Sequence, residues 1–501
     1  MTGREKSDGR VVSEGLGNQV PIVETRGEKA ATAIERMQGR ELENGTAGRP
    51  KPFSTAHPSA PAQEVCMEQI ADEANLREAF KRVAANRGAP GPDGRTIEDV
   101  RRGLDTTVAK LCRSLLNGSY RPGEIRRVWI PKAGGGERGL GIPNVVDRIV
   151  QQAILQKLSP LYEREFHDSS HGFRPGRSCH TAIAEAKQHV ASGRNWVVDI
   201  DLEKFFDRVP HQRLLSTLER RVSDRRIVQV VARMLRSKVA MPNGVIVTTE
   251  EGTPQGGPLS PLLSNIVLNE LDWELERRRH RFVRYADDMN VYVQSERAGQ
   301  RVFAGLKRFL EQRMRLQVNA SKSAVSRPRG RHFLGFSIRP NLAKKRVELD
   351  VSERTRKRLR QRIQELTPRN WGRSLRTCIE EINLYLRGWA EYFGVAYWAG
   401  GVARYADGHL RRRLRAILLT HWKKPATIRR QLIQLGAPKN YVEASVGSAN
   451  QPWRRTMTLA VNYGLRNEHF ARWGLLSLDE LCAKRLLAGL PVSDSSPKAI
   501  G

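Results

Sequence analysis

The stretch Arg284–Met289 carries two adjacent carboxylates, Asp287 and Asp288, between two runs of β-forming residues. This pattern predicts a β-hairpin whose tip presents both carboxylates side by side. Asp tolerates the left-handed dihedrals of such a tip, but two neighbouring anions repel each other. A divalent cation such as Mg²⁺ would offset that repulsion, and in a two-metal site such carboxylates support in-line phosphoryl displacement. An ordinary exposed Asp-Asp turn is the alternative explanation.

A further acidic position ends a predicted strand, Trp196–Asp201. Alternation along this strand places Trp196, Val198 and Ile200 on one face and Val197, Asp199 and Asp201 on the other. A carboxylate after a buried strand is costly unless it is solvated or metal-bound. Asp199 and Asp207 compete with Asp201 for that role, although turn chemistry explains Asp207. An antiparallel sheet backed by helices would bring the strand beside the hairpin, where three carboxylates and two metals could perform nucleotidyl transfer.

Several polar residues next to predicted turns are candidates for phosphate contact. Lys132 and Arg138 stand on the arms of a predicted hairpin with a glycine-rich tip. They could clamp a triphosphate, Arg by bidentate geometry and Lys as a point charge, or they could be solvated strand charges. Arg174 and Arg177 precede a predicted helix, where phosphate contact and a simple helix start both fit. Gln255 could hydrogen-bond a nucleotide or its own loop.

The composition is globular but strongly basic, since 86 Lys and Arg face 53 Asp and Glu, for a formal net charge of +33. A field of that sign concentrates polyanions, so we expect a nucleic acid partner, with anionic lipid as the competing interpretation. No segment has the roughly 18 continuous apolar residues of a membrane span, and the N-terminus lacks the apolar core of a signal peptide. We therefore expect a cytoplasmic protein without a membrane partner. The five separated cysteines predict free thiols.

Helical and extended patterns alternate between these motifs. Residues 1–65 are rich in Gly, Glu, Ser and Pro and predict a disordered tail. A helical pattern begins at Glu68, and further helices are expected over Val145–Leu158, Leu214–Leu235 and Leu259–Leu275. A strand pair is expected to end at Ile338.

Beyond about Val347 the pattern changes to helices with heavy positive charge. Apolar residues spaced by three and four predict a packed helical seam: Leu375, Ile379, Ile382, Leu386, Trp389 and Phe393. Four aromatic residues are expected to belong to the core rather than to form base-stacking platforms: Tyr385, Trp389, Tyr392 and Trp398. Residues 404–408 are similar in sequence to the acidic hairpin, but they lack its second Asp and lie in a helical pattern. We therefore interpret this similarity as coincidental. The chain is expected to close with a short helical segment around Leu459–Leu465 and a polar tail.

In this order the motifs resemble a bacterial group II intron-encoded reverse transcriptase and maturase. The resemblance runs from about Ala85 to about Trp422 and includes the helical stretch Leu386–Phe393, which is similar to the maturase-specific thumb, or X, region. It rests on six successive blocks: Arg138–Gln152, His171–Ser178, Asp201–His211, Gly252–Leu263, Tyr285–Asp288 and Phe333–Phe336. Several ordered blocks are more specific than any single short motif.

The resemblance implies an α+β right-hand polymerase, with a palm built on an antiparallel sheet backed by helices. It implies five regions: a tail at 1–65, an N-terminal extension and fingers at 66–165, the palm at 166–345, a helical thumb or maturase domain at 346–435, and a C-terminal extension at 436–501. The implied activity is RNA-directed DNA polymerisation, in which a dNTP is joined to a primer 3′-hydroxyl with two Mg²⁺ ions.

The resemblance also assigns roles to individual residues. It gives the catalytic and metal-binding role to Asp201, Asp287 and Asp288, and so decides against Asp199 and Asp207. Phe206 is implied to abut the incoming sugar and to exclude a ribose 2′-hydroxyl, which makes the product DNA. Four further residues match nucleotide-binding positions: Lys132, Arg138, Gln255 and Lys322.

The implied partners are the group II intron RNA, an RNA template, a DNA primer, dNTPs and target DNA. The basic thumb and fingers would grip the intron RNA, largely through backbone and shape contacts, and help it to fold for splicing. Many relatives end in a zinc-bearing His-Asn-His endonuclease, whereas this C-terminus contains only Cys482, so we expect no intrinsic DNA cleavage.

Two other functions fit the same residues. One is a reverse transcriptase with a host role, such as phage defence or diversity generation. The other is an RNA-binding splicing cofactor that does not polymerise. RNA-templated RNA synthesis is disfavoured by Phe206.

Overall fold

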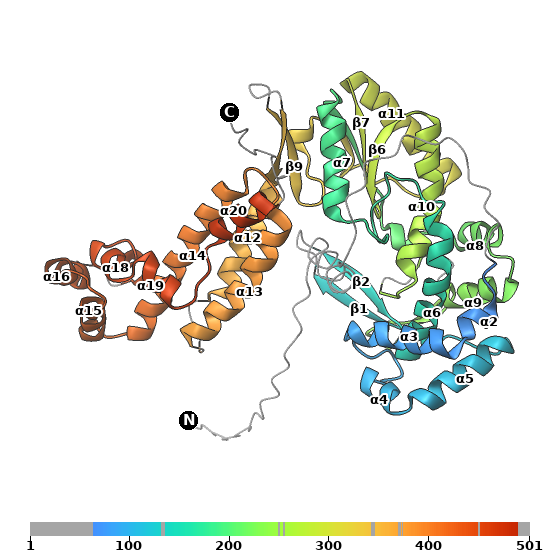
Figure 1. Ribbon diagram of the computed structural model, residues 1–501, viewed down its shortest axis with the longest axis horizontal. Helices are drawn as coiled ribbons and strands as arrows, with labels where there is room; N and C mark the ends of the chain where they lie inside the picture. The colour runs from blue at the N-terminus through green and yellow to red at the C-terminus, as the bar shows by residue number, and fades with distance from the viewer. Residues whose placement is uncertain are drawn as a thin grey trace, which may run out of the picture.

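The computed structural model describes residues 64–131, 136–248, 251–253, 256–341, 346–368, 372, 374–448 and 451–488. Candidate residues Lys132 and Gln255 lie outside these ranges, as does the expected tail up to residue 63. A body of helices and mostly antiparallel strands is followed by a lobe of helices that extends beside it (Figure 1). This arrangement confirms the α+β fold and the helical C-terminal region that the sequence predicts.

The N-terminal part of the body packs helices against a small sheet. Its helices are α2 (Met67–Ala71), α3 (Glu73–Ala85), α4 (Ile97–Arg102), α5 (Leu104–Leu116) and α6 (Val145–Glu163). The Asp72 side chain accepts a hydrogen bond from the Asn75 N–H, which ends α2 and caps α3. The expected hairpin is present as antiparallel β1 (Ile125–Pro131) and β2 (Glu137–Ile142). Short β4 (Val239–Ala240) and β5 (Ile246–Val247) complete the strand order β2-β1-β4-β5.

A second four-stranded sheet forms the centre of the molecule. Its strands are β6 (Arg281–Tyr285), β7 (Asp288–Val293), β3 (Trp196–Asp201) and β8 (Ala324–Ser326), all antiparallel and in that order. The predicted alternation along β3 is confirmed, because Val198 and Ile200 belong to one hydrophobic cluster and Val197 to another. The central sheet therefore separates two cores.

Helices cover both faces of the central sheet. Helices α10 (Ser260–Arg277) and α11 (Glu296–Arg308) pack on one face, and α7 (Cys179–Ala191) packs on the other (Figure 1). The single helix expected over Leu214–Leu235 is wrong. The chain forms α8 (His211–Glu219) and α9 (Arg225–Leu235), because Asp224 accepts a hydrogen bond from the Arg226 N–H and starts a new helix.

A hairpin of β9 (Phe336–Asn341) and β10 (Arg346–Val351) joins the body to the helical lobe. The expected strand pair ending at Ile338 is wrong, because β8 pairs with β3 and β9 pairs with β10. Gly335 turns the chain before β9 with a φ of +86°. A Cβ there would lie 2.9 Å from the Phe393 ring, so this turn also packs against the lobe.

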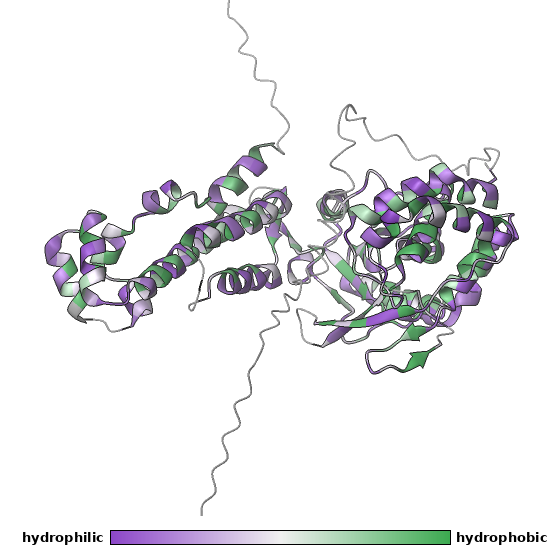
Figure 2. Cartoon of the chain, turned by 90° about the horizontal axis from the view of Figure 1, so that it is seen from below, coloured by the Kyte–Doolittle hydropathy of each residue, from purple (hydrophilic) through white to green (hydrophobic). Residues whose placement is uncertain are grey.

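Nine helices make up the described part of the lobe. They are α12 (Glu353–Leu366), α13 (Leu375–Phe393), α14 (Ala399–Trp422), α15 (Pro425–Gln434), α16 (Lys439–Ser448), α17 (Pro452–Arg455), α18 (Leu459–Gly464), α19 (Asn467–Arg472) and α20 (Leu478–Ala488). Hydrophilic and hydrophobic residues alternate along its long helices (Figure 2). The predicted seam on α13 is confirmed, since Ile379, Ile382, Leu386 and Trp389 are buried.

The polar tail expected after residue 465 is wrong as far as residue 488, because α20 packs on α13 and α14. Residues 404–408, whose sequence is similar to the acidic hairpin, lie on α14 and explain part of this packing. Asp407 is buried and accepts hydrogen bonds from the Leu478 and Asp479 N–H groups at 2.9 and 3.2 Å. It therefore caps the start of α20. Among the helices of the described ranges, none has the length and apolar character of a membrane span.

Candidate active site

The hairpin of β6 and β7 presents the acidic pair as the sequence predicts. Tyr285 pairs with Asp288, so Ala286 and Asp287 form a two-residue turn. Ala286 has a φ of +56°. The left-handed conformation costs an L-residue roughly 1–2 kcal/mol, so surrounding contacts must hold this turn in place.

Arg284, at the end of β6, supplies the main contact. Its side chain is 1% exposed and forms a bidentate ion pair with the fully buried Asp272 of α10. Its Nη1 donates to the carbonyl oxygen of Ala286 and to Asn265 Oδ1, both at 2.9 Å. Nη2 also donates to Ser170 Oγ at 2.7 Å. The buried guanidinium thus ties the strained turn to α10.

A loop before α7 supports the same turn from another side. Backbone hydrogen bonds of 2.8 Å join His171 N to Arg284 O and Arg284 N to Ser169 O. A Cβ on Gly172 would lie 2.3 Å from the Ala286 nitrogen, so only glycine fits there. Asn265 Nδ2 donates to the Gly172 carbonyl at 2.8 Å and fixes this close approach.

The two arginines of this loop serve the local fold. Arg174 is buried, pairs with Glu163 at 2.7 Å and donates to the carbonyls of His167 and Ser170. Arg177 pairs with Asp168 at 2.6 Å. Of the two interpretations that the sequence left open, these contacts favour the helix start over phosphate contact.

Asp201 and Asp288 lie opposite each other on β3 and β7. Directly opposed residues of an antiparallel pair point to the same face, with Cα atoms about 4.5–5.5 Å apart. Asp287 precedes Asp288 in the turn. As the side chains stand, no group of three or more His, Cys, Asp or Glu in the described residues could hold a metal ion. The register nevertheless puts Asp201 and Asp288 on one face of the sheet, with Asp287 beside them in the turn.

The segment before β8 holds the end of β3. The Asp201 N–H donates to Ser323 Oγ at 3.0 Å, and the Asn319 N–H donates to the Asp201 carbonyl at 2.8 Å. Lys322 in the same segment places its Nζ 3.5 Å from Asp201 Oδ2, and its side chain is 67% exposed. The structure thus brings Lys322 to the candidate carboxylate.

The competing carboxylates have other environments. Asp199 pairs with Arg331, whose Nε donates to Asp199 Oδ2 at 2.8 Å. Burial raises the pKa of the Asp199 carboxyl, and the positive charge and hydrogen bond of Arg331 lower it by a smaller amount. Asp207 is 42% exposed and lies 3.9 Å from Arg127. Neither is directly opposite Asp288, the position that Asp201 occupies.

Phe206 lies close to this strand end, in the short 3₁₀ helix η1 (Phe205–Asp207). Its side chain is buried at 8% exposure, and its carbonyl accepts a hydrogen bond from the Thr253 N–H at 2.6 Å. Gly252, with a φ of +97°, lies against the Asp207 backbone. Residues 252–253 therefore run beside the candidate sugar-contacting residue.

The same segment leads to the N-terminal sheet. A Cβ on Gly256 would lie 2.4 Å from the carbonyl oxygen of Gly141 on β2, and one on Gly257 would lie 2.2 Å from Gln151 on α6. Residues 252–253 thus lie beside Phe206 and Asp207, and residues 256–257 lie beside α6 and β2, which also carries the half-buried Arg138. Gln255 stands between these two pairs in the sequence and lies outside the described residues.

Comparison with known proteins agrees with this geometry. Residues 130–338 match the family model for reverse transcriptase (RNA-dependent DNA polymerase), and residues 356–434 match the group II intron, maturase-specific domain. The chain belongs to the group II intron-encoded reverse transcriptases and maturases. Its reverse transcriptase domain contains every candidate site residue, and its maturase domain covers much of the helical lobe.

Two curated relatives share part of this reverse transcriptase. Protein YkfC of Escherichia coli (strain K12) is 41% identical over 210 residues, which cover 40% of this chain and 55% of the relative. Group II intron-encoded protein LtrA of Lactococcus lactis subsp. cremoris is 37% identical over 196 residues, 39% of this chain and 32% of the relative. The chain therefore matches about half of the first relative and a third of the second.

Among solved structures, a chain of a partial Cas6-RT-Cas1–Cas2 complex aligns with 49% of this reverse transcriptase and 42% of its own length. The TM-score is 0.33 and the sequence identity is 22%. This structural similarity is too weak to indicate a function for the chain.

Glu185 of α7 binds the loop before α7, which supports the acidic turn of the reverse transcriptase. Burial by itself raises the pKa of the Glu185 carboxyl, but hydrogen bonds from His171, His189 and Ser169 outweigh it and lower the pKa to about 2. The His171 Nε2 to Glu185 Oε2 distance is 2.7 Å. Glu185 therefore stabilises the loop as a carboxylate.

This lowered pKa predicts a loss of stability in acid. A carboxyl whose folded-state pKa lies below its ordinary 4.5 contributes stability above pH 4.5, and loses it as the pH falls toward about 2. We expect Glu185→Gln to remove roughly 3 kcal/mol of pH-dependent stability. Denaturant unfolding between pH 2 and 7 measures it. A Glu185→Gln profile parallel to that of wild type would contradict the expectation.

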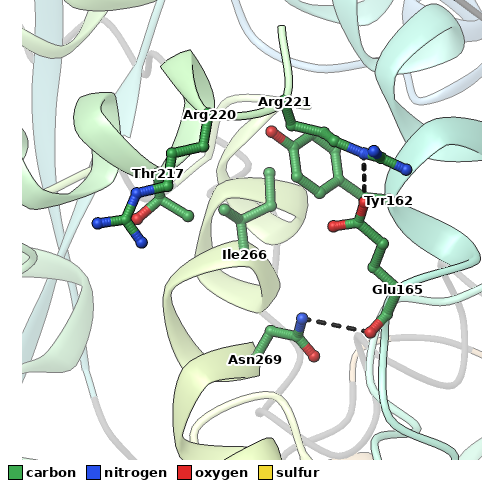
Figure 3. Close-up of a pocket in the computed structure, with 7 residues that line it drawn as sticks. All are labelled: Tyr162, Glu165, Thr217, Arg220, Arg221, Ile266 and Asn269. Carbon is green, nitrogen blue, oxygen red and sulfur yellow. Dashed lines mark hydrogen bonds and ion pairs between the residues drawn. The ribbon is translucent and has the colours of Figure 1, made fainter. Parts of the chain in front are cut away.

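A separate small cavity lies where α6, α8 and α10 of the reverse transcriptase meet (Figure 3). Its volume is about 160 Å³, and none of the candidate site residues lines it. Glu165 bridges its walls, because its carboxylate pairs with Arg221 and its carbonyl accepts a hydrogen bond from Asn269 at 3.3 Å. These contacts join the helix of the N-terminal part to the helices of the central part.

Proposed function

We propose that the protein is an RNA-directed DNA polymerase that joins dNTPs to a primer 3′-hydroxyl. The observation that carries this proposal is the register of Asp201 opposite Asp288, with Asp287 in the adjoining turn. Oxygen ligands of this kind suit Mg²⁺. Asp201, Asp287 and Asp288 would hold two such ions, whose chemistry is to activate the hydroxyl and to stabilise the leaving pyrophosphate.

We assign the remaining candidate residues to the incoming nucleotide. Lys322 lies within 3.5 Å of Asp201 and is exposed enough to reach a phosphate. We assign Arg138, together with Lys132 and Gln255, to the incoming triphosphate and base. The regions that we propose are an N-terminal extension and fingers at 66–165, the palm at 166–345, a helical thumb or maturase domain at 346–435 and a C-terminal extension at 436–501.

We further propose that the protein binds its group II intron RNA and promotes splicing and mobility. The maturase-specific match over residues 356–434 and the net charge of +33 support this role. Target DNA would be the second nucleic acid partner. A splicing assay with the intron RNA at near-physiological salt tests the role, and unchanged splicing would remove it.

Primer extension tests the polymerase proposal. The reaction contains an RNA template, a DNA primer, Mg²⁺ and either dNTPs or NTPs, and we expect extension with dNTPs only. If wild type extends nothing, the enzymatic proposal fails and the non-polymerising splicing cofactor gains support. A gene without a surrounding intron RNA would favour the host role instead.

Sugar selection by Phe206 gives a separate prediction. The ring is buried and follows the last residue of β3 by five residues in the chain, so we expect a smaller side chain to open space where a 2′-hydroxyl could enter. We expect Phe206→Ala to raise the incorporation of NTPs relative to dNTPs by about tenfold or more. Phe206→Tyr keeps the ring and should preserve the discrimination. Equal discrimination by Phe206→Ala and wild type, measured from kcat/KM for both substrates, would rule out this role.

A further inference from the structure

The helical lobe contains a cavity that the proposed polymerase chemistry does not use. It lies between α12 and α14, with β9 and β10 contributing to its wall, and its volume is about 400 Å³. That volume falls within the roughly 300–1,000 Å³ of small-ligand sites. None of the candidate catalytic residues lines it.

Two exposed aromatic rings line this cavity. Tyr405 is 62% exposed and Trp398 is 44% exposed, so the expectation that Trp398 is core is wrong. The Trp398 Nε1–H donates to Glu348 Oε2 at 3.0 Å, which fixes the indole. The Arg360 Cζ lies 5.2 Å from the Tyr405 ring centroid. Aromatic faces and guanidinium planes are the surfaces on which unpaired nucleobases stack.

The strands β9 and β10 and the helix α12 supply paired charges to the lining, with more cations than anions in total. Asp350 is 1% exposed and lies between Arg339 and Arg356, at 2.6 and 2.7 Å. With Arg360 and Glu353, the lining has three guanidinium groups against two carboxylates. One carboxylate orients two arginines, whose remaining donors favour a phosphate.

The remaining lining favours a ligand with an apolar face over a free phosphate, because Leu359, Ile363 and Ala406 contribute buried apolar side chains. His409 adds a polar group, since its buried Nε2 has no hydrogen-bond partner. Burial and nearby arginines lower the pKa of His409, so its imidazole is neutral at pH 7 and has one donor and one acceptor nitrogen. A planar heteroaromatic ring with polar edges and an attached phosphate matches this lining.

We propose that this cavity binds one unpaired nucleotide of a single-stranded nucleic acid. The base extends the stack of Tyr405 and Arg360, its edge meets His409, and its phosphate lies toward Arg339. The proposal rests on the proposed function, because it takes the nucleic acid of the polymerase as the ligand. The cavity would contact the nucleic acid at a second place, away from the candidate catalytic carboxylates.

A binding measurement tests the cavity without requiring catalysis. Fluorescence anisotropy of a labelled single-stranded oligouridylate RNA, and of the matching DNA, is measured at fixed salt without divalent ions. We expect Tyr405→Leu, which keeps apolar bulk but removes the ring, to weaken binding by roughly fivefold or more. Tyr405→Phe should bind like wild type. Tyr463→Leu, on α18 with a ring that is 39% exposed, is the matched control and should also bind like wild type.

Photocrosslinking adds a readout of direct contact. An oligonucleotide containing 5-iodouridine should crosslink to Tyr405 or Trp398, identified by mass spectrometry of the peptides. Weaker binding of RNA, of DNA or of both by Tyr405→Leu supports the proposal. The strand whose binding weakens is the one that the cavity contacts. Wild-type affinity of Tyr405→Leu for both strands, or crosslinks confined to other regions, would overturn it. Primer extension by wild type separates this result from a failure of the proposed polymerase.

Discussion

Asp201→Asn is expected to reduce dNTP incorporation by about a thousandfold or more while leaving the fold intact. The substitution keeps the shape of the side chain but removes a charge that would hold a divalent cation. Metal stabilisation of a transition state is worth several kcal/mol, and each 1.36 kcal/mol is tenfold in rate. The side chain is 30% exposed, and its ion-pair partner Lys322 is largely exposed, so little stability depends on it.

Single-turnover primer extension measures the rate, and a thermal melt checks the fold. Asp207→Asn is the matched control, because Asp207 is 42% exposed, 3.9 Å from Arg127, and not opposite Asp288. We expect its rate to equal that of wild type. Substantial activity in Asp201→Asn, or an equal loss in Asp207→Asn, would remove the metal-binding role from Asp201.

The features of the site that were predicted from the sequence depend on local patterns. Apolar and polar residues that alternate with a period of two between turn residues predict the strand Trp196–Asp201, its two faces and the acidic hairpin. Such a pattern depends only on residues that are close in sequence. The register that sets Asp201 opposite Asp288 is a long-range fact. The choice of Asp201 over Asp199 came from the family resemblance, and the pairing of Asp199 with Arg331 agrees with it.

The errors arose where tertiary contacts decide local structure. The break between α8 and α9 had a sequence signal, because Asp224 precedes α9 as a capping residue should. By contrast, Asp407 could not be recognised as the cap of α20, since its partners Leu478 and Asp479 lie some seventy residues away in sequence. The tail was interpreted as polar for the same reason.

The supports of the catalytic turn were also missed. Arginine in a strand indicates an exposed position, yet Arg284 is 1% exposed because Asp272, Asn265 and Ser170 meet it from distant segments. Gly172 gave no signal either, because its need for glycine comes from the Ala286 backbone. Sequence reasoning thus located the carboxylates but not what holds them.

Arg284→Ala is expected to lower the free energy of unfolding by about 3–5 kcal/mol, because it leaves the fully buried Asp272 carboxylate without its partner. It should also reduce the polymerase rate by about a hundredfold, since Ala286 loses the hydrogen bond that holds its strained turn. Denaturant unfolding measures the first effect and primer extension the second. Arg281→Ala, at the other end of β6, is the control and should have smaller effects on both.

A double variant separates positioning from stability. Replacing a buried ion pair by apolar residues of similar volume is often neutral, so Arg284→Met with Asp272→Leu should recover most of the lost stability. It cannot restore the donor to the Ala286 carbonyl, so the rate should stay low while KM for the dNTP changes little. Recovery of both stability and rate in the double variant would show that Arg284 stabilises the fold without positioning Asp287 and Asp288. A stable but slow enzyme would instead mean that the geometry of the acidic turn depends on a guanidinium buried behind it.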